Sequence, residues 1–171
     1  MAVIAFAALS CWAVPAHAGS TSCLTGSEVA VSADPAAIAT ARSTIEAMCP
    51  CAAFDGTAGK SRGSHQQCAN GVVDALVAGG LLRAECRSTL RRLSATSVCG
   101  RKTEAEAMPC VRRSATGKVS CTIKAPAERC EDRPGVYEQS ACELFTHCID
   151  AADSNGDLLI DASDDGRCRP A

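Results

Sequence analysis

The clearest signs of chemistry in this sequence lie in the stretch DSNGDLLIDASD, residues 153–164, where an acidic or amide side chain stands at nearly every second position. Calcium prefers oxygen ligands, and the twelve-residue EF-hand loop supplies them from positions 1, 3, 5, 7, 9 and 12, with a backbone carbonyl at position 7. The spacing therefore predicts one calcium site, with calcium as the cofactor. Its ligands would be Asp153, Asn155, Asp157, the Leu159 carbonyl, Asp161 and Asp164.

Two departures from the loop pattern predict weak binding. Position 6 normally holds a glycine because the backbone turns there with a positive φ, but this sequence has Leu158 at position 6 and Gly156 at position 4. Position 12 is Asp164, which is shorter than the usual glutamate that reaches the ion with both oxygens. We therefore expect a dissociation constant of ~10⁻⁴ to 10⁻³ M, as in extracellular calcium modules. A second register that starts at Asp161 places Gly166 at position 6 but does not reach position 12.

The simpler alternative for this stretch is a solvated acidic tail. Residues 131–165 contain ten acids and one base, so acidity alone is not a specific signal. The spacing nevertheless favours a cation site, because the acids follow the loop pattern and the apolar Ile160 stands at position 8. Carboxylates crowded together also repel one another unless a cation compensates their charge. The mechanism that we expect is therefore ordering of this segment on metal binding.

The sequence CIDAADSNGDLLIDASD, residues 148–164, resembles the calcium loop of dockerin-type and related EF-hand repeats in secreted bacterial proteins. In that family two such loops pair, each is followed by a helix, and the pair docks onto a partner protein. This sequence has one loop without a following helix, so the resemblance implies the ion site alone. Cys148 and Cys168 bracket the loop, and we expect them to form a disulfide that closes it in place of the helix.

Residues 36–130 resemble a second group, an uncharacterised cysteine-rich family of secreted bacterial proteins. The resemblance rests on three segments and implies no activity. They are CPC (49–51), LLRAECRSTLRRLSATSVCGR (81–101) and GKVSCTIK (117–124).

The first 18 residues are typical of a signal peptide. An apolar run from Val3 to Val14 is followed by Ala16-His17-Ala18, which predicts cleavage near Ala18. A lipid-anchored start at Cys11 is the minor alternative. Of the 13 cysteines, the 12 that follow this segment indicate a disulfide framework in an oxidising compartment. We therefore expect a secreted, extracellular or periplasmic protein without a transmembrane segment, because the apolar run is shorter than the ~20 residues that span a bilayer.

Local patterns predict a mainly α fold: a small disulfide-rich helical domain with a short β-hairpin and a C-terminal EF-hand-like loop. Helices are expected over residues 34–48, 64–79, 82–97 and 141–149, where the second and fourth begin with the capping boxes Ser64–Gln67 and Ser140–Glu143. The hairpin is expected over 110–113 and 118–124. The predicted organisation is a signal peptide (1–18), a flexible N-terminus (19–33), a cysteine-rich helical domain with the hairpin (34–131) and an acidic calcium-loop segment (132–171).

No catalytic residues are predicted, and we expect the protein not to be an enzyme. His65 is better explained by its place beside a helix cap, and His147 by packing or solvation, since neither belongs to a known nucleophile motif. Cys49-Pro50-Cys51 is interpreted as two ends of separate structural disulfides, and no zinc spacing is present.

A row of arginines offers a second interaction surface. These residues could meet an anionic partner such as a polysaccharide, form an ordinary exposed helix face, or face the acidic end of the chain. Nucleic acid is not expected, because no aromatic residues stand beside the arginines to stack on bases. The row consists of Arg83, Arg87, Arg91 and Arg92.

These observations together predict a secreted, disulfide-stabilised binding or structural protein with a single calcium-binding EF-hand-like loop. Its expected partners are the calcium ion and an extracellular protein or polysaccharide. The alternative is a saposin-like or lipid-transfer-like protein, in which helices joined by disulfides enclose a lipid in a continuous apolar cavity.

Overall fold

The structure is a computed structural model. It describes residues 22–26, 29–101, 107–130, 137–161, 163, 164 and 168. The predicted signal peptide and its cleavage site lie outside the described residues. Among the described residues, no helix has the length and apolar character needed to cross a membrane.

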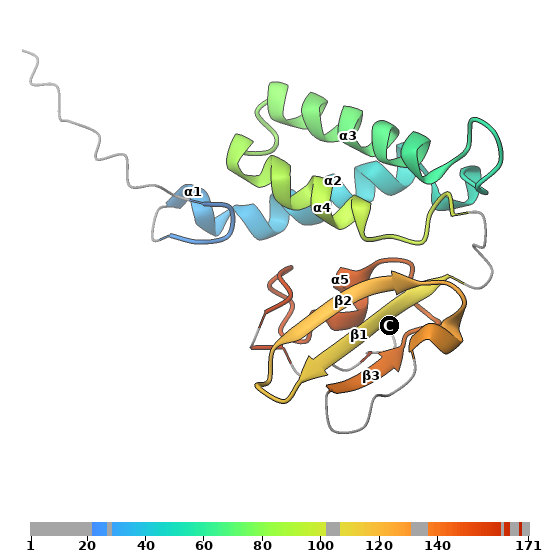
Figure 1. Ribbon diagram of the computed structural model, residues 1–171. Coiled ribbons are helices and arrows are strands. Elements are labelled where there is room, and N and C mark those ends of the chain that lie inside the picture. The colour runs from blue at the N-terminus through green and yellow to red at the C-terminus, as the bar shows by residue number, and fades with distance from the viewer. Residues whose placement is uncertain are drawn as a thin grey trace, which may run out of the picture.

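A helical layer forms the first half of the described chain (Figure 1). Its main members α2, α3 and α4 pack against one another, and short turns connect them. The elements are α1 (Val29–Ser32), α2 (Asp34–Met48), the 3₁₀ turn η1 (Cys51–Ala53), α3 (Arg62–Ala78), the 3₁₀ turn η2 (Ala84–Cys86) and α4 (Arg87–Ala95).

Helix α2 confirms the first predicted helix at both ends. It begins at Asp34 with a proline in its first turn, where the missing amide costs no hydrogen bond, and it ends at Met48 shortly before Pro50. Ile38 and Ile45 lie on one face and are buried. The helix is therefore held by an apolar face that the sequence spacing predicts.

Helix α3 differs from the prediction at its start. Ser61, and not Ser64, is the capping residue, because the Ser61 side chain accepts a hydrogen bond of 3.3 Å from the Ser64 amide. The helix accordingly begins at Arg62. Its end is as predicted, since Gly79 caps it and Gly80 adopts a φ of 69°, a conformation that glycine reaches without steric cost.

The third predicted helix is divided into η2 and α4. All four of its predicted core positions are buried: Leu82, Cys86, Leu90 and Leu93. Three of its arginines pair with acids of the helical layer itself and not with the acidic end of the chain. The pairs are Arg83 with Asp34, and Arg87 and Arg91 with Asp74.

A three-stranded antiparallel sheet forms the second layer, and it overturns the mainly α prediction. The predicted hairpin is present as β1 (Met108–Ser114) and β2 (Val119–Lys124). A third strand, β3 (Tyr137–Ala141), pairs with the other edge of β1, which gives the order β2-β1-β3. The fold is thus mixed α/β, with the 3₁₀ turn η4 (Ala127–Cys130) between the second and third strands.

The predicted helix over residues 141–149 is also wrong. Ser140 lies in β3 opposite Val111 and does not cap a helix. A shorter helix, α5 (Cys148–Ala152), begins later and packs against β1 and β2. The capping pattern is a local signal, and pairing of these residues with β1, which is distant in the sequence, overrides it.

Helix α5 and the loop after it join the two layers. Ile149 belongs to the helical core, whereas Ala151 and Ala152 belong to the smaller core beneath the sheet. Ile160 packs against both cores. Two backbone hydrogen bonds hold the start of α5 to the segment that follows α4. The Val98 amide donates to the Thr146 carbonyl, and the Cys148 amide donates to the Thr96 carbonyl.

The 12 described cysteines form six disulfides, which confirms the disulfide framework expected from the cysteine count. Three bridges lie within the helical layer and three within the sheet and the segment after it. Each typically contributes ~2 to 4 kcal/mol, which helps a chain with only 3% aromatic residues. The pairs are Cys23–Cys86, Cys49–Cys68, Cys51–Cys99, Cys110–Cys130, Cys121–Cys148 and Cys142–Cys168.

Candidate metal site

The candidate loop, residues 153–164, is anchored to the sheet at both ends. Before the loop, Cys148 of α5 is bonded to Cys121 of β2. After the loop, Cys168 is bonded to Cys142, the residue that follows β3. The predicted Cys148–Cys168 bridge is therefore wrong, because α5 packs on β2 and brings Cys148 to that strand. The two real bridges fix the ends of the loop separately.

The first half of the loop is organised around Asp153. Its Oδ1 accepts a hydrogen bond of 2.7 Å from the Gly156 amide, and its Oδ2 accepts one of 2.8 Å from the Leu158 amide. Leu158 has a φ of 67°, so the backbone takes the left-handed conformation at the loop position where glycine is usual. Leu158 thus provides, at a steric cost, the turn that its side chain disfavours.

Asn155 and Asp157 continue this half of the loop with short-range turns. Asn155 Oδ1 accepts from the Asp157 amide at 2.9 Å, and Asp157 Oδ1 accepts from the Leu159 amide at 2.8 Å. The Asn155 amide group also donates to Asp157 Oδ2 at 3.2 Å and to Ser163 Oγ at 2.8 Å. Such turns, in which a side chain accepts from the amide two residues later, are common in polar loops without a metal.

Asp164 closes the loop and is only 4% exposed. Its Oδ1 accepts from the Ser154 amide at 2.7 Å and from the Ser154 hydroxyl at 3.2 Å. Its Oδ2 accepts from the Asp161 amide at 2.8 Å. The Asp164 carboxylate therefore binds the backbone of both Ser154 and Asp161, near the two ends of the loop.

Asp161 is the predicted ligand that the structure places apart. It is exposed, and its Oδ1 accepts two hydrogen bonds of 2.7 Å from Ser163, one from the amide and one from the hydroxyl. These hydrogen bonds, the hydroxyl first, lower the pKa of Asp161. The carboxylate is thus ionised and satisfied by its own loop.

The charges of the other acids act on Asp153. Its pKa is raised, first by burial and also by the nearby carboxylates Asp157 and Asp164, while the amides of Leu158 and Gly156 oppose the shift. The loop therefore brings two other carboxylates, Asp157 and Asp164, close enough to destabilise the charge on Asp153. This is the electrostatic situation that a cation would relieve.

The acids of the loop nevertheless do not converge on one centre in this structure. Within the described part of the chain, the only three acidic, histidine or cysteine groups whose ligand atoms lie within 4.8 Å of one another belong to Cys23, Asp34 and Cys86. Those two cysteines are bonded to each other, so that group is no metal site. Asp34 instead pairs with Arg83 at 3.0 Å and accepts from the Leu24 amide.

Two residues of the loop that the sequence analysis did not select have structural roles here. Ser154 donates twice to Asp164, and Ser163 links Asn155 to Asp161. The sequence signal for these two roles is that serine and aspartate close together in a loop often form local hydrogen bonds. The spacing rule concerns ligand positions only and does not include these residues.

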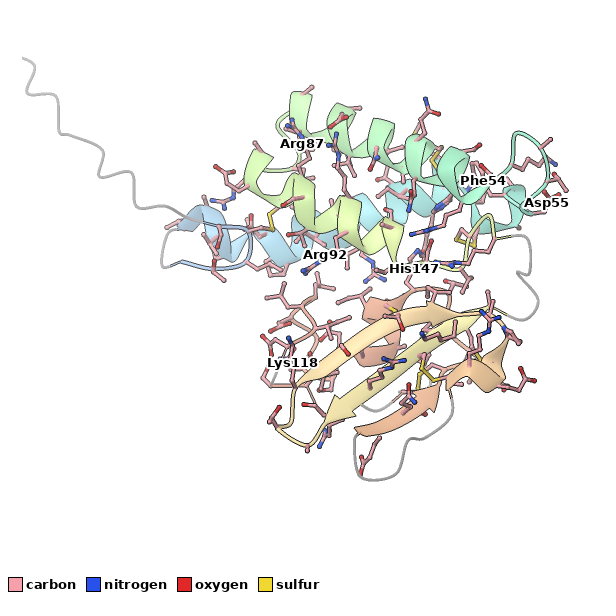
Figure 2. All side chains as sticks on the ribbon, in the orientation of Figure 1. Phe54, Asp55, Arg87, Arg92, Lys118 and His147 are labelled. Atoms are coloured by element: carbon pink, nitrogen blue, oxygen red, sulfur yellow. A yellow bond between two sulfur atoms is a disulfide. The ribbon has the colours of Figure 1, made fainter. Side chains whose placement is uncertain are left out.

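A second ionisable cluster joins α2 to α5. Arg42 forms an ion pair and hydrogen bond with Asp150, whose other oxygen lies 3.8 Å from Nδ1 of His147. The His147 side chain is 16% exposed. Burial first, and Arg42 as well, lower the pKa of His147, while Asp150 and Glu46 oppose the shift. His147 Nδ1 also shares a hydrogen bond of 2.9 Å with the Thr146 hydroxyl. The cluster thus links α2 to the start of α5, where His147 is labelled in Figure 2.

No protein-family model matches the chain, no curated protein is similar at a significant level, and no solved structure matches its fold at a significant level.

Proposed function

We propose that this protein is an exported, disulfide-stapled binding or structural protein whose C-terminal loop binds one calcium ion. The observation that carries the proposal is the backbone of Leu158, which has a φ of 67° and donates its amide to Asp153. The calcium loop requires that left-handed turn at its sixth position, and the chain makes it without the glycine. The spacing of the acids and the path of the backbone therefore support the same interpretation.

The side chains of the loop retain capacity for a cation. A carboxylate oxygen has two lone pairs, so Asp153 and Asp157 can each accept an amide and still face an ion. Asp161 would have to leave Ser163, and Asp164 would have to share oxygens that now bind Ser154 and the Asp161 amide. Because this rearrangement opposes binding, the weak affinity expected from the sequence remains our estimate, with a dissociation constant of ~10⁻⁴ to 10⁻³ M.

Export is supported by the cysteines. Six disulfides in one small chain are typical of proteins in oxidising compartments and rare in reducing ones. A calcium site of millimolar affinity would also be useful only where free calcium is abundant. The two parts of the proposal are therefore consistent with each other.

The lipid-binding alternative has less support. A saposin-like protein needs helices that enclose an apolar cavity, whereas three large side chains fill the space between α2, α3 and α4. These are Ile38, Val73 and Leu90, and each is less than 2% exposed. The described helical core is thus packed and not hollow, which counts against a lipid enclosed among these three helices.

Calcium titration of the metal-free protein tests the proposal. At ~10 mM calcium, about ten times the weaker expected dissociation constant, binding should stabilise the fold by about 1.4 kcal/mol. For a chain of this size, that corresponds to a melting temperature higher by about 3–6 °C. Magnesium at the same concentration controls for ionic strength, and it should give a smaller shift because it demands a tighter octahedral shell.

Asp161→Ala provides the sharpest variant for this titration. Asp161 is exposed, so its loss should leave the metal-free melting temperature nearly unchanged while removing most of the calcium shift. Glu143→Ala is the matched control, because Glu143 is an exposed acid outside the loop. Absence of both binding heat and a thermal shift at ~10 mM calcium would refute the calcium site.

A further inference from the structure

A cleft of about 250 Å³ opens between the helical layer and the sheet. Its walls come from α4, from the start of β2, from α5 and from the candidate loop, so four segments distant in sequence meet there. Ten residues line it: Arg92, Leu93, Thr96, Lys118, Val119, Ser120, Cys121, Cys148, Ile149 and Ile160.

The inner part of this cleft is apolar and well fixed. Leu93, Val119 and Ile149 are buried core residues, and Ile160 is half-buried beside them. The disulfide between Cys121 and Cys148 joins two of the walls. An apolar ligand group placed here would gain from burial on a surface that is already formed.

The rim of the cleft carries two positively charged side chains. Arg92 and Lys118 lie on facing layers, and both are exposed (Figure 2). Within the described residues neither forms an ion pair, although the neighbouring arginines of the same helical segment, Arg83, Arg87 and Arg91, all do. None of the lining residues is acidic. A concave site with charge of one sign attracts ligands of the other sign.

We propose that this cleft binds a small amphipathic anion, with an apolar body against Leu93 and Ile149 and a carboxylate between Arg92 and Lys118. The size supports a small ligand: 250 Å³ corresponds to about eight waters at ~30 Å³ each, just below the usual range of small-molecule sites. A guanidinium can bind a carboxylate with two parallel hydrogen bonds, and an ammonium adds a point charge. Because the floor of the cleft is apolar, we expect the site to bind an anion with an apolar body more tightly than a free inorganic anion.

This proposal does not depend on calcium. Only Ile160 belongs to the candidate loop. Arg92 belongs to α4, Lys118 precedes β2, and the rest of the apolar floor belongs to α4, β2 and α5. Measurements in chelator and in calcium therefore separate the two proposals. Binding of the anion in chelator supports the cleft even if the loop never binds metal.

The experiment is a titration of the full disulfide-bonded protein with octanoate, followed by calorimetry and by NMR shifts of the methyl groups of Ile149 and Ile160. We expect saturable binding, with shifts at these methyl groups. Three reference ligands separate the contributions: 1-octanol lacks the charge, octylamine reverses it, and acetate lacks the apolar body. 1-Octanol and octylamine should each bind more than about tenfold more weakly than octanoate, since each of the two exposed ion pairs contributes up to ~1 kcal/mol. Acetate should also bind more weakly, because it lacks the apolar chain that the cleft would bury.

Variants then locate the site. Arg92→Gln and Lys118→Gln should each weaken octanoate by about threefold to fivefold, and the double variant by more than about tenfold. Lys124→Gln is the matched control, because it removes a cation at the other end of β2, outside the cleft. Both cleft cations are exposed, so circular dichroism and melting should be unchanged in the two single cleft variants and in the double variant.

Two results would overturn the proposal. One is the absence of saturable octanoate binding by the wild-type protein in both chelator and calcium. The other is binding that Lys124→Gln weakens as much as the double variant does, or that 1-octanol and octylamine match, since the site would then not be the cationic cleft.

Discussion

The amide of Leu158 donates a hydrogen bond of 2.8 Å to Oδ2 of Asp153, and Leu158 makes this bond from a left-handed backbone with a φ of 67°. A left-handed conformation costs an L-residue roughly 1–2 kcal/mol. The Leu158 side chain is half-buried and packs against the helical core, which offsets that cost. The backbone conformation of Leu158 therefore destabilises the loop, whereas the packing of its side chain against the helical core stabilises it.

Replacing Leu158 with glycine separates these two effects. Leu158→Gly relieves the backbone strain but loses the buried side chain, so we expect a small net change in the free energy of unfolding. Leu159→Gly is the control, because Leu159 is the neighbouring half-buried leucine and has no positive φ. It should destabilise the protein by about 1–2 kcal/mol more than Leu158→Gly does, as measured by denaturant unfolding in chelator. Equal losses would contradict the strain argument.

The buried carboxylate of Asp164 gives a second prediction. Asp164→Ala removes the acceptor for the part-buried amides of Ser154 and Asp161, and the loss of a hydrogen bond to a charged group costs about 1.5–3 kcal/mol. We expect a loss of about 2–3 kcal/mol in the free energy of unfolding without metal. Asp161→Ala serves as the control and should cost less than about 0.5 kcal/mol, because its carboxylate is exposed. Similar losses for the two variants would show that Asp164 does not close the loop.

Local sequence patterns predicted the helices well because helix ends and apolar helix faces are encoded by residues close together in the sequence. Asp34-Pro35 and Gly79-Gly80 mark helix ends by backbone chemistry that needs no partner. The third strand was missed for the opposite reason. Its residues pair with β1, so that Ala141 lies opposite Cys110, and no local signal encodes a partner about thirty residues away. Ser140 and Glu143 instead matched a capping pattern that the sheet overrides.

The calcium-loop spacing identified the polar side chains of the loop but did not predict the direction in which each side chain points. Asp153 and Asp164 face inward and accept backbone amides, whereas Asp161 is held at the surface by Ser163. These orientations depend on short competing hydrogen bonds from serines and amides, which spacing does not rank. The pairing of cysteines was equally beyond sequence, because proximity in the chain suggested Cys148–Cys168 while the packing of α5 on β2 decides otherwise.

The bridge between Cys142 and Cys168 gives a third prediction, since it restrains the chain after the loop. A non-reducing peptide map should link Cys168 to Cys142 and Cys148 to Cys121. The double variant Cys142→Ser with Cys168→Ser should lower the free energy of unfolding by about 2–4 kcal/mol and speed hydrogen exchange of the Leu158 amide. A peptide that links Cys148 to Cys168 would contradict this topology.

The last prediction concerns pH. Burial lowers the pKa of His147 below its ordinary value of 6.5, with Arg42 acting in the same direction and Asp150 and Glu46 against it. A histidine whose pKa is lowered in the folded state contributes stability above pH 6.5, and this contribution is lost as the pH falls through the folded-state pKa. Stability should therefore decrease on acidification from pH 7.5 to 5, with His147 contributing at most about 1.4 kcal/mol per pH unit.

The variant His147→Gln should remove part of this dependence. Glutamine keeps a polar group beside Asp150 but does not titrate, so the unfolding free energy of the variant should fall less steeply below pH 6.5. His65 is also buried with a lowered pKa, and it will leave a residual slope in both proteins. An NMR titration of the His147 ring provides the direct measurement. A His147 pKa at or above 6.5, or identical slopes for the two proteins, would show that its protonation is not coupled to the contact between the layers.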